Sequence, residues 1–168
     1  MTKDEIKNFL LQGTFTGKLG TINKDGTSHV VPIWYILDEE ENVIFNTRDK
    51  SVKAKNISRD NRVRLCVDDQ VPLFSFVTID GIAEIISNNP NEVFKWAKLI
   101  ASRYVGQEKS ELYGRRNSAG GELLIKIKPI RVIGQKDIAA GNPTNLKINL
   151  PIGKIIYGRI NSSFLQRS

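Results

Sequence analysis

The stretch FNTRDKSVKAKNI, residues 45–57, joins an apolar segment to a basic segment of helical character. It continues a hydrophobic segment that begins at Asn42 and ends at Thr47. A short polar turn then leads to a segment of helical character that opens at Ser51. The first N–H groups of a helix lack intrahelical partners and lie at the positive end of the helix dipole, so they attract anions. A strand that ends in a hydroxyl residue just before such a helix therefore predicts an anion-binding turn.

Four basic residues surround this turn, namely Arg48, Lys50, Lys53 and Lys55. Their charges favour binding of a phosphate group at the turn between Thr47 and Ser51, which we call the phosphate seat. Charge runs of this kind also occur on ordinary solvated helices. From these residues alone, the phosphate seat and the solvated basic helix remain equal alternatives.

Length and composition predict one globular domain. The 168 residues are 40% hydrophobic and 26% charged, which is ordinary for a folded domain. The net charge of +7 could attract nucleic acid, acidic lipid or an anionic small ligand. The basic residues are spread along the chain without the interleaved aromatics typical of RNA-binding sheets. We therefore expect an anionic cofactor and no nucleic-acid or membrane partner.

The chain has a single cysteine, Cys66, and a single histidine, His29. One cysteine excludes an intrachain disulfide. One cysteine and one histidine also provide too few ligands for a usual structural zinc site. No metal site is therefore expected. The sequence shows no signal peptide and no apolar run long enough for a membrane helix, so a cytoplasmic location is expected.

The first half of the chain predicts a helix over residues 2–11, followed by three strands. Residues 17–23, 27–38 and 42–47 alternate or are fully apolar, and an Asn-Lys-Asp-Gly turn separates the first two. We expect them to form an antiparallel meander. Pro32 cannot donate to a ladder, so it indicates either an edge strand or a place where a ligand approaches the backbone. Trp34 is expected on the same face of the strand as Pro32. It could contact a ligand there, or it could be a residue of the core or of a dimer interface.

The second half predicts three helices and three strands, with ends defined by capping residues. Gly81 lies inside one long apolar strand and indicates a bend. Asn89 and Pro90 open a strongly amphipathic helix that Gly106 ends. The expected helices cover residues 51–59, 90–105 and 109–116, and the expected strands cover 62–69, 73–86 and 121–134. We expect residues 1–138 to form one domain and residues 139–168 to be a C-terminal arm or tail, with a short strand in KIIYGRI.

These elements and three motifs resemble a known family. The segments GKLGTINKDGTSHVVPIWY, FNTRDKSVKAKNI and RDNRVRLCVDD are similar, in order and spacing, to the FMN-binding split β-barrel family of pyridoxamine 5′-phosphate oxidase-like proteins. IASRYVGQE and YGRR resemble its branch of deazaflavin (F-420)-dependent enzymes. The resemblance covers roughly residues 5–135 and implies a mainly β fold, an antiparallel split barrel with peripheral helices.

The resemblance also implies a cofactor site. In the family, the strand that matches residues 29–34 runs beside the isoalloxazine ring, and the positions of Thr47, Ser51 and Lys53 bind the cofactor phosphate. Members are homodimers with the cofactor in the groove between subunits. The expected cofactor-binding residues are His29, Val30, Val31, Pro32, Trp34, Thr47, Lys50, Ser51 and Lys53.

The sequence departs from the oxidases proper at three positions. The oxidases proper carry arginine, lysine and arginine where this chain has His29, Trp34 and Val52. Their C-terminal Trp/Arg segment has no counterpart in this sequence. We therefore expect an oxidoreductase that uses FMN or F-420 on a small organic substrate, and not a true pyridoxine-phosphate oxidase. The alternatives are a non-catalytic flavin or haem binder, with His29 as the obvious axial ligand, and a basic barrel that binds nucleic acid.

No residue stands out as a catalytic acid or base. His29 could titrate near neutral pH, and Tyr35 and Tyr104 could donate a proton, but lone histidines and tyrosines in strands and helices are commonly structural. The catalytic residues are therefore left unassigned.

Overall fold

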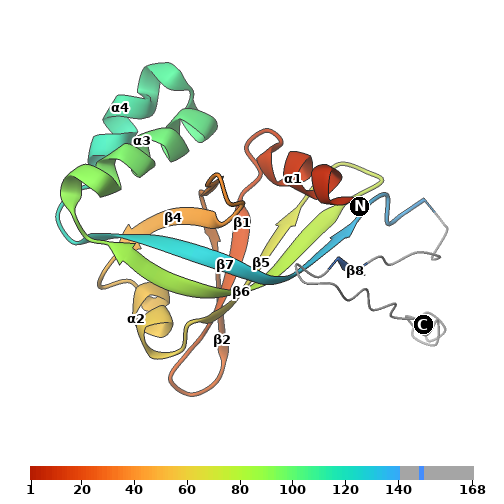
Figure 1. Ribbon diagram of the computed structural model, residues 1–168, viewed down its shortest axis with the longest axis horizontal. Helices are drawn as coiled ribbons and strands as arrows, with labels where there is room; N and C mark the ends of the chain where they lie inside the picture. The colour runs from red at the N-terminus through yellow and green to blue at the C-terminus, as the bar shows by residue number, and fades with distance from the viewer. Residues whose placement is uncertain (141–147, 150–168) are drawn as a thin grey trace.

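Residues 1–140 and 148–149, the part of the chain that the computed structural model describes, form a strongly curled antiparallel sheet with four helices around it (Figure 1). The sheet order is β2-β1-β5-β6-β7-β4-β3, and β8 pairs with β7 beside this path. The strands are β1 (Gly17–Ile22), β2 (Ser28–Ile33), β3 (Ile36–Leu37), β4 (Val43–Arg48), β5 (Arg62–Asp68), β6 (Phe76–Ser87), β7 (Glu122–Gln135) and β8 (Ile148–Asn149). The helices are α1 (Lys3–Leu11), α2 (Val52–Arg59), α3 (Pro90–Val105) and α4 (Gln107–Arg116). The expected mainly β fold with peripheral helices is confirmed.

The two edge strands of the sheet, β2 and β3, are joined by only Trp34 and Tyr35. A chain spans at most about 3.3–3.6 Å per residue, so the two edges must approach each other at this link. The sheet can meet that requirement only by curling. The two-residue link thus explains the half-closed barrel seen in Figure 1.

The prediction of one strand over residues 27–38 in a three-strand meander is wrong. Its first part, β2, pairs with β1, whereas its last residues, β3, pair with β4 at the opposite edge. β4 in turn pairs with β7 and not with β2. The edge position of β2 explains why Pro32 is tolerated there, because β2 forms a ladder on one side only.

Arg103 on α3 holds the link between the edges. Its guanidinium donates hydrogen bonds to the carbonyl oxygens of Leu10 at 2.7 Å, Tyr35 at 3.0 Å and Gly13 at 3.1 Å. It also lies over the rings of Tyr35 and Tyr104, 4.6 and 5.1 Å from their centroids. A strand that ran straight through residue 35 would lose these contacts, which is the physical reason why the strand breaks.

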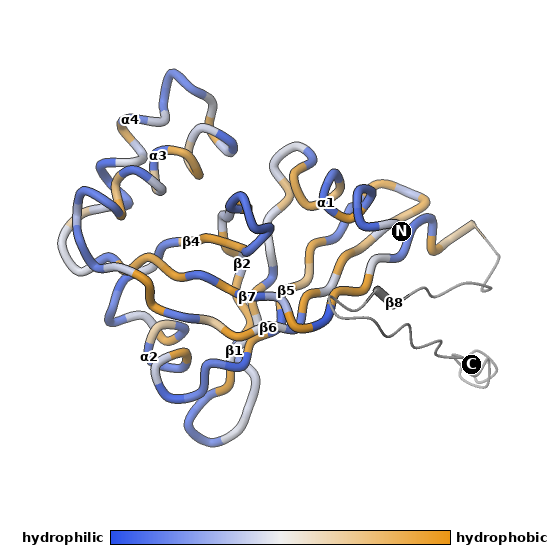
Figure 2. The backbone as a smooth tube through the Cα atoms, in the orientation of Figure 1, coloured by the Kyte–Doolittle hydropathy of each residue, from blue (hydrophilic) through white to orange (hydrophobic). Residues whose placement is uncertain are grey.

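The strand β4 and the first part of β7 are buried on both faces. Phe45 and Ile125 belong to the core cluster inside the barrel, whereas Ile44 and Leu124 pack against Val93 of α3 on the outside. A strand covered on two sides needs apolar side chains at nearly every position. Figure 2 shows this pattern, since the hydrophobic stretches lie mainly along the strands.

Gly81 bends the long strand β6 as expected. The register between β6 and β7 shifts between Asp80 and Gly81. A Cβ atom at Gly81 would lie 2.6 Å from Cγ2 of Ile127 and 2.7 Å from the carbonyl oxygen of Lys128. Only glycine therefore allows β6 and β7 to approach this closely.

Side chains at the helix starts match the sequence signals. In α1, the Thr2 N–H donates to the Glu5 carboxylate at 2.7 Å and the Glu5 N–H donates to the Thr2 hydroxyl at 3.2 Å, a complete capping box. In α3, Asn89 accepts from the N–H of Asn91 at 2.9 Å. The two helices therefore begin where their capping residues predicted.

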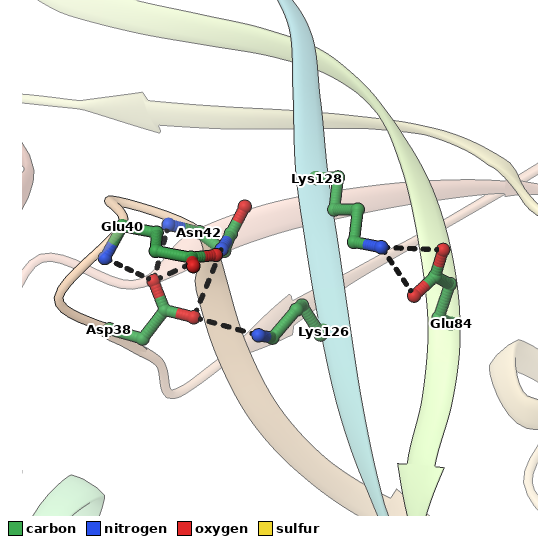
Figure 3. A network of polar contacts seen from close by, with 6 residues as sticks. All are labelled: Asp38, Glu40, Asn42, Glu84, Lys126 and Lys128. Carbon is green, nitrogen blue, oxygen red and sulfur yellow. Dashed lines mark hydrogen bonds and ion pairs between the residues drawn. The ribbon is translucent and has the colours of Figure 1, made fainter.

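Two carboxylate–lysine pairs connect β7 to other parts of the sheet (Figure 3). Asp38 closes the β3–β4 turn by accepting from the N–H of Asn42 at 2.8 Å, and it pairs with Lys126 of β7 at 3.1 Å. On the neighbouring strand β6, Glu84 pairs with Lys128 at 2.9 Å. Both pairs link residues that lie far apart in sequence.

Most of residues 139–168, the expected arm or tail, lies outside the described residues, as does the KIIYGRI stretch. Within that segment, β8 pairs Ile148 with Ile133 and Asn149 with Val132 of β7. In the described part of the chain, no helix is long and apolar enough to cross a membrane.

Replacing Arg103 with alanine should lower the free energy of unfolding by about 2–4 kcal/mol, because three backbone carbonyls lose a charged donor. Arg103→Lys should recover only part of the loss, since an ammonium cannot reach three acceptors in the fork geometry. Urea denaturation measures both. Arg62→Ala, at an exposed arginine paired with Asp60, is the control and should change little. An Arg103→Ala variant as stable as the parent would contradict the role of Arg103.

Candidate functional site

An open cleft of about 580 Å³ lies where the ends of β2 and β4, the start of α2, the end of α4 and the start of β7 meet. This volume is in the range of small-molecule sites. Its lining residues are Pro32, Ile33, Trp34, Asn46, Thr47, Arg48, Ser51, Lys53, Tyr113, Arg116, Asn117 and Glu122.

Two hydroxyl groups line the cleft at the start of α2. The Thr47 and Ser51 hydroxyl oxygens are 3.0 Å apart, and the Ser51 side chain caps α2 by accepting from the N–H of Ala54 at 3.2 Å. The strand β4 ends one residue after Thr47, so the chain needs only a tight turn to bring the two hydroxyls together. The first-turn N–H groups of Val52 and Lys53 lie at the same point and have no intrahelical acceptor. The expected turn from strand to helix is therefore present.

Lys53 brings a positive charge into the cleft. Burial lowers the pKa of Lys53, and the negative charge of Glu122 partly opposes that shift. A half-buried ammonium is a stronger partner for an anion than a fully hydrated one, because fewer water molecules screen it. Arg48 and Arg116 add exposed cations on either side.

Glu122, the first residue of β7, places a carboxylate beside these cations. Its Oε2 accepts from Nδ2 of Asn46 at 3.2 Å, and its Oε1 lies 3.5 Å from Nε of Arg48. Burial raises the pKa of Glu122, while Asn46, Arg48 and Lys53 act in the opposite direction. The phosphate seat therefore contains the carboxylate of Glu122 as well as several basic side chains.

Asn46 ties the end of α4 to the cleft. Its Nδ2 also donates to the carbonyl oxygen of Asn117 at 2.7 Å. Asn117 follows α4 directly, and its own N–H donates to the carbonyl oxygen of Tyr113 at 2.9 Å. This chain of hydrogen bonds connects the end of α4 to the cleft, which Tyr113 and Arg116 also line.

Aromatic rings form the remaining wall. Trp34 stacks on Tyr104 with ring centroids 4.9 Å apart and an interplanar angle of 1°, and it meets Tyr113 at 6.1 Å. Pro32 continues the wall along β2. Trp34 and Tyr113 thus add flat aromatic rings to the same cleft as the hydroxyls and cations.

The structure brings five of the nine expected cofactor-binding residues together in this cleft, namely Pro32, Trp34, Thr47, Ser51 and Lys53. His29, Val30, Val31 and Lys50 do not line it. His29 lies farther along β2, where it pairs with Thr21. Whether the nine residues bind a cofactor stays a prediction.

Sequence reasoning did not single out six of the lining residues as site residues: Ile33, Asn46, Tyr113, Arg116, Asn117 and Glu122. Tyr113 and Arg116 lie in the YGRR motif, which was the available signal for this wall. Glu122 enters the cleft only because β7 pairs with β4, with Glu122 opposite Arg48. That pairing joins segments far apart in sequence and has no local signal.

The two tyrosines considered as proton donors are occupied by structural contacts. The Tyr35 hydroxyl donates to the carbonyl oxygen of Leu10 at 2.6 Å, and burial raises the pKa of Tyr35 to about 12. The Tyr104 hydroxyl donates to the carbonyl oxygen of Phe15 at 2.8 Å and accepts from the N–H of Tyr35 at 3.3 Å. Neither hydroxyl is free to donate a proton to a ligand.

Comparison with protein families gives a match over most of the chain. The family described as Pyridoxamine 5′-phosphate oxidase matches residues 2–136. This range includes every residue that lines the cleft.

Individual relatives extend this comparison. A 5a,11a-dehydrotetracycline/5a,11a-dehydrooxytetracycline reductase from Streptomyces rimosus is 34% identical over 99 residues, which cover 54% of this chain and 68% of the reductase. The crystal structure of Rv2991, a conserved hypothetical protein from Mycobacterium tuberculosis, superposes with a TM-score of 0.71 at 26% identity and covers 86% of this chain and 91% of that one. A solved F420 reductase superposes with a TM-score of 0.61 at 25% identity and covers 74% of this chain and 94% of that one.

Proposed function

Because the chain belongs to the pyridoxamine 5′-phosphate oxidase family, we propose that it is an oxidoreductase that binds FMN or the deazaflavin F-420 in the cleft between β4, α2 and α4. The observation that carries this proposal is the meeting of Thr47, Ser51 and Lys53 at the start of α2. Two reductases among the relatives support the class of reaction.

The residues of the cleft fit a cofactor phosphate. Thr47 and Ser51 supply hydroxyl donors, the first turn of α2 supplies N–H donors, and Lys53 supplies charge. Charge-assisted bonds of this kind are the usual means of phosphate recognition in proteins. Arg48 and Arg116 would reach a longer anionic tail from the rim.

The aromatic wall suits the planar ring of the cofactor. Trp34 is held flat against Tyr104, so it would not have to reorganise when a ring lies against the wall. When bound, the cofactor supplies hydride transfer at its ring, and the protein supplies binding and orientation. No catalytic acid or base is proposed.

The substrate proposed is a small organic molecule that accepts or donates hydride. The tetracycline reductase shows that a relative reduces a multi-ring organic substrate. The vitamin phosphate of the oxidases proper is not proposed, because His29, Trp34 and Val52 replace the basic residues found there.

The alternative functions have less support in this cleft. The only histidine, His29, does not line it, which weakens the case for a haem ligand there. For nucleic acid, many surface cations are paired with carboxylates, as in Arg64 and Arg131 with Asp80. Such pairs neutralise the charge that phosphate backbones would need.

We also propose a homodimer in which the partner subunit completes the groove. Val30 on the edge strand β2 is 60% exposed, and Val52 at the start of α2 is 49% exposed. Both lie within two residues of the cleft-lining residues Pro32 and Lys53 in sequence. Apolar side chains beside an open cleft fit a surface covered by a second copy.

Replacing Lys53 with alanine should weaken binding of FMN or F-420 by about tenfold to a hundredfold, the loss of one charge-assisted phosphate bond. Fluorescence titration of the purified protein with each cofactor measures the effect. Lys55→Ala, at an exposed lysine of the same helix that does not line the cleft, is the matched control. Equal affinities in the Lys53 variant and the parent would refute the phosphate seat, and binding of neither cofactor by the parent would refute the proposed function.

The dimer has a separate test. Light scattering at micromolar concentration should give twice the chain mass of 18.9 kDa. Val30→Asp should shift the mass toward the monomer, because a charge on the proposed interface would be buried without a partner. Val71→Asp, at a 64% exposed valine in the β5–β6 connection, should leave the dimer intact. A monomeric parent would rule out the shared groove.

A further inference from the structure

Glu122 places a carboxylate in the proposed phosphate seat. Its side chain is only 9% exposed, and in the β4–β7 ladder it stands opposite Arg48. It lines the same cleft as Thr47, Ser51 and Lys53. An anion that binds in this cleft is repelled by the ionised Glu122 carboxylate, although Arg48 at 3.5 Å and Lys53 offset part of that charge.

The negative charge of Glu122 is not required for its hydrogen bond. Asn46 donates its side-chain N–H to the Glu122 carboxylate at 3.2 Å, and the oxygen of a glutamine would accept the same bond. Burial raises the pKa of Glu122, so the fold holds this carboxylate against a desolvation cost. When it is ionised, Glu122 acts on a ligand in the cleft as well as on Arg48 and Lys53.

The repulsion depends on the charge of the ligand phosphate. Coulomb energy is proportional to the product of the two charges. A phosphate monoester carries a charge of about −2 above its second pKa near 6, whereas a phosphodiester carries a single charge. The same carboxylate thus opposes a monoester about twice as strongly, in free energy, as a diester.

We propose that Glu122 is a specificity-determining residue of the cleft, which favours a singly charged phosphodiester over a doubly charged phosphate monoester. This inference rests on the proposed function, namely that the seat at the start of α2 binds a cofactor phosphate. FMN ends in a phosphate monoester, whereas the phosphate of F-420 is a diester within a longer tail. Glu122 therefore favours the deazaflavin over FMN.

Glu122→Gln tests this role, because glutamine keeps the shape and the Asn46 contact and removes the charge. Three probes that share one ring isolate the phosphate: FMN, its monomethyl phosphate ester and riboflavin. They are titrated by fluorescence at pH 8, where the FMN phosphate is a dianion. The variant should bind FMN about tenfold more tightly, the methyl ester about threefold more tightly and riboflavin no more tightly than the parent.

Equal gains for FMN and the methyl ester, or no gain for either, would overturn the role of Glu122 while leaving the cofactor site intact. Failure of the parent and the variant to bind any probe or F-420 would overturn the proposed function, and the role of Glu122 with it. The matched control is Glu84→Gln, which removes the same charge from the Glu84–Lys128 pair on β6, outside this cleft (Figure 3). It should bind all three probes like the parent.

Thermal melting checks that each variant folds. Glu122→Met, a neutral side chain of similar size, is the second variant and should show the same order of gains, FMN before the methyl ester. A gain for riboflavin as large as that for FMN would show that the cleft had merely widened, which would also overturn the proposal.

Discussion

The two-residue link between β2 and β3 sets how far the sheet curls, and the curl positions the cleft. Because only Trp34 and Tyr35 join β2 to β3, the sheet has to curl until these two edges lie close together at the link. Arg103 fixes that meeting by bonding to the end of α1 and to the link itself. The same geometry holds Trp34 against Tyr104 at the wall of the cleft. One arginine thus connects barrel closure to the proposed site.

The predictions from sequence succeeded where the determining residues are neighbours in the chain. The caps of α1 and α3, the bend at Gly81 and the turn from Thr47 to Ser51 each depend on a few adjacent residues, and each is present. The prediction of a meander was wrong because β2 and β3 belong to opposite edges of the sheet. The strand breaks between them where Arg103, far along the chain, bonds to the carbonyl oxygen of Tyr35. Periodicity cannot show such a contact.

The candidate site divides in the same way. The half formed by β4 and α2 was predictable, since strand, turn and helix follow one another within residues 43–59. The half formed by α4 and β7 depends on the β4–β7 ladder and on the Asn46 bonds to Asn117 and Glu122. That half supplies the carboxylate that distinguishes this seat from a simple basic one. The net charge of +7 therefore says little about the local field in the cleft.

A crystal structure of the protein with bound FMN or F-420 would show directly where the cofactor phosphate lies. We expect the phosphate at the start of α2, about 2.7–3.2 Å from the hydroxyls of Thr47 and Ser51 and the ammonium of Lys53. We expect the ring against the wall that Pro32 and Trp34 form. A phosphate bound elsewhere, with the start of α2 in contact only with solvent, would contradict the account.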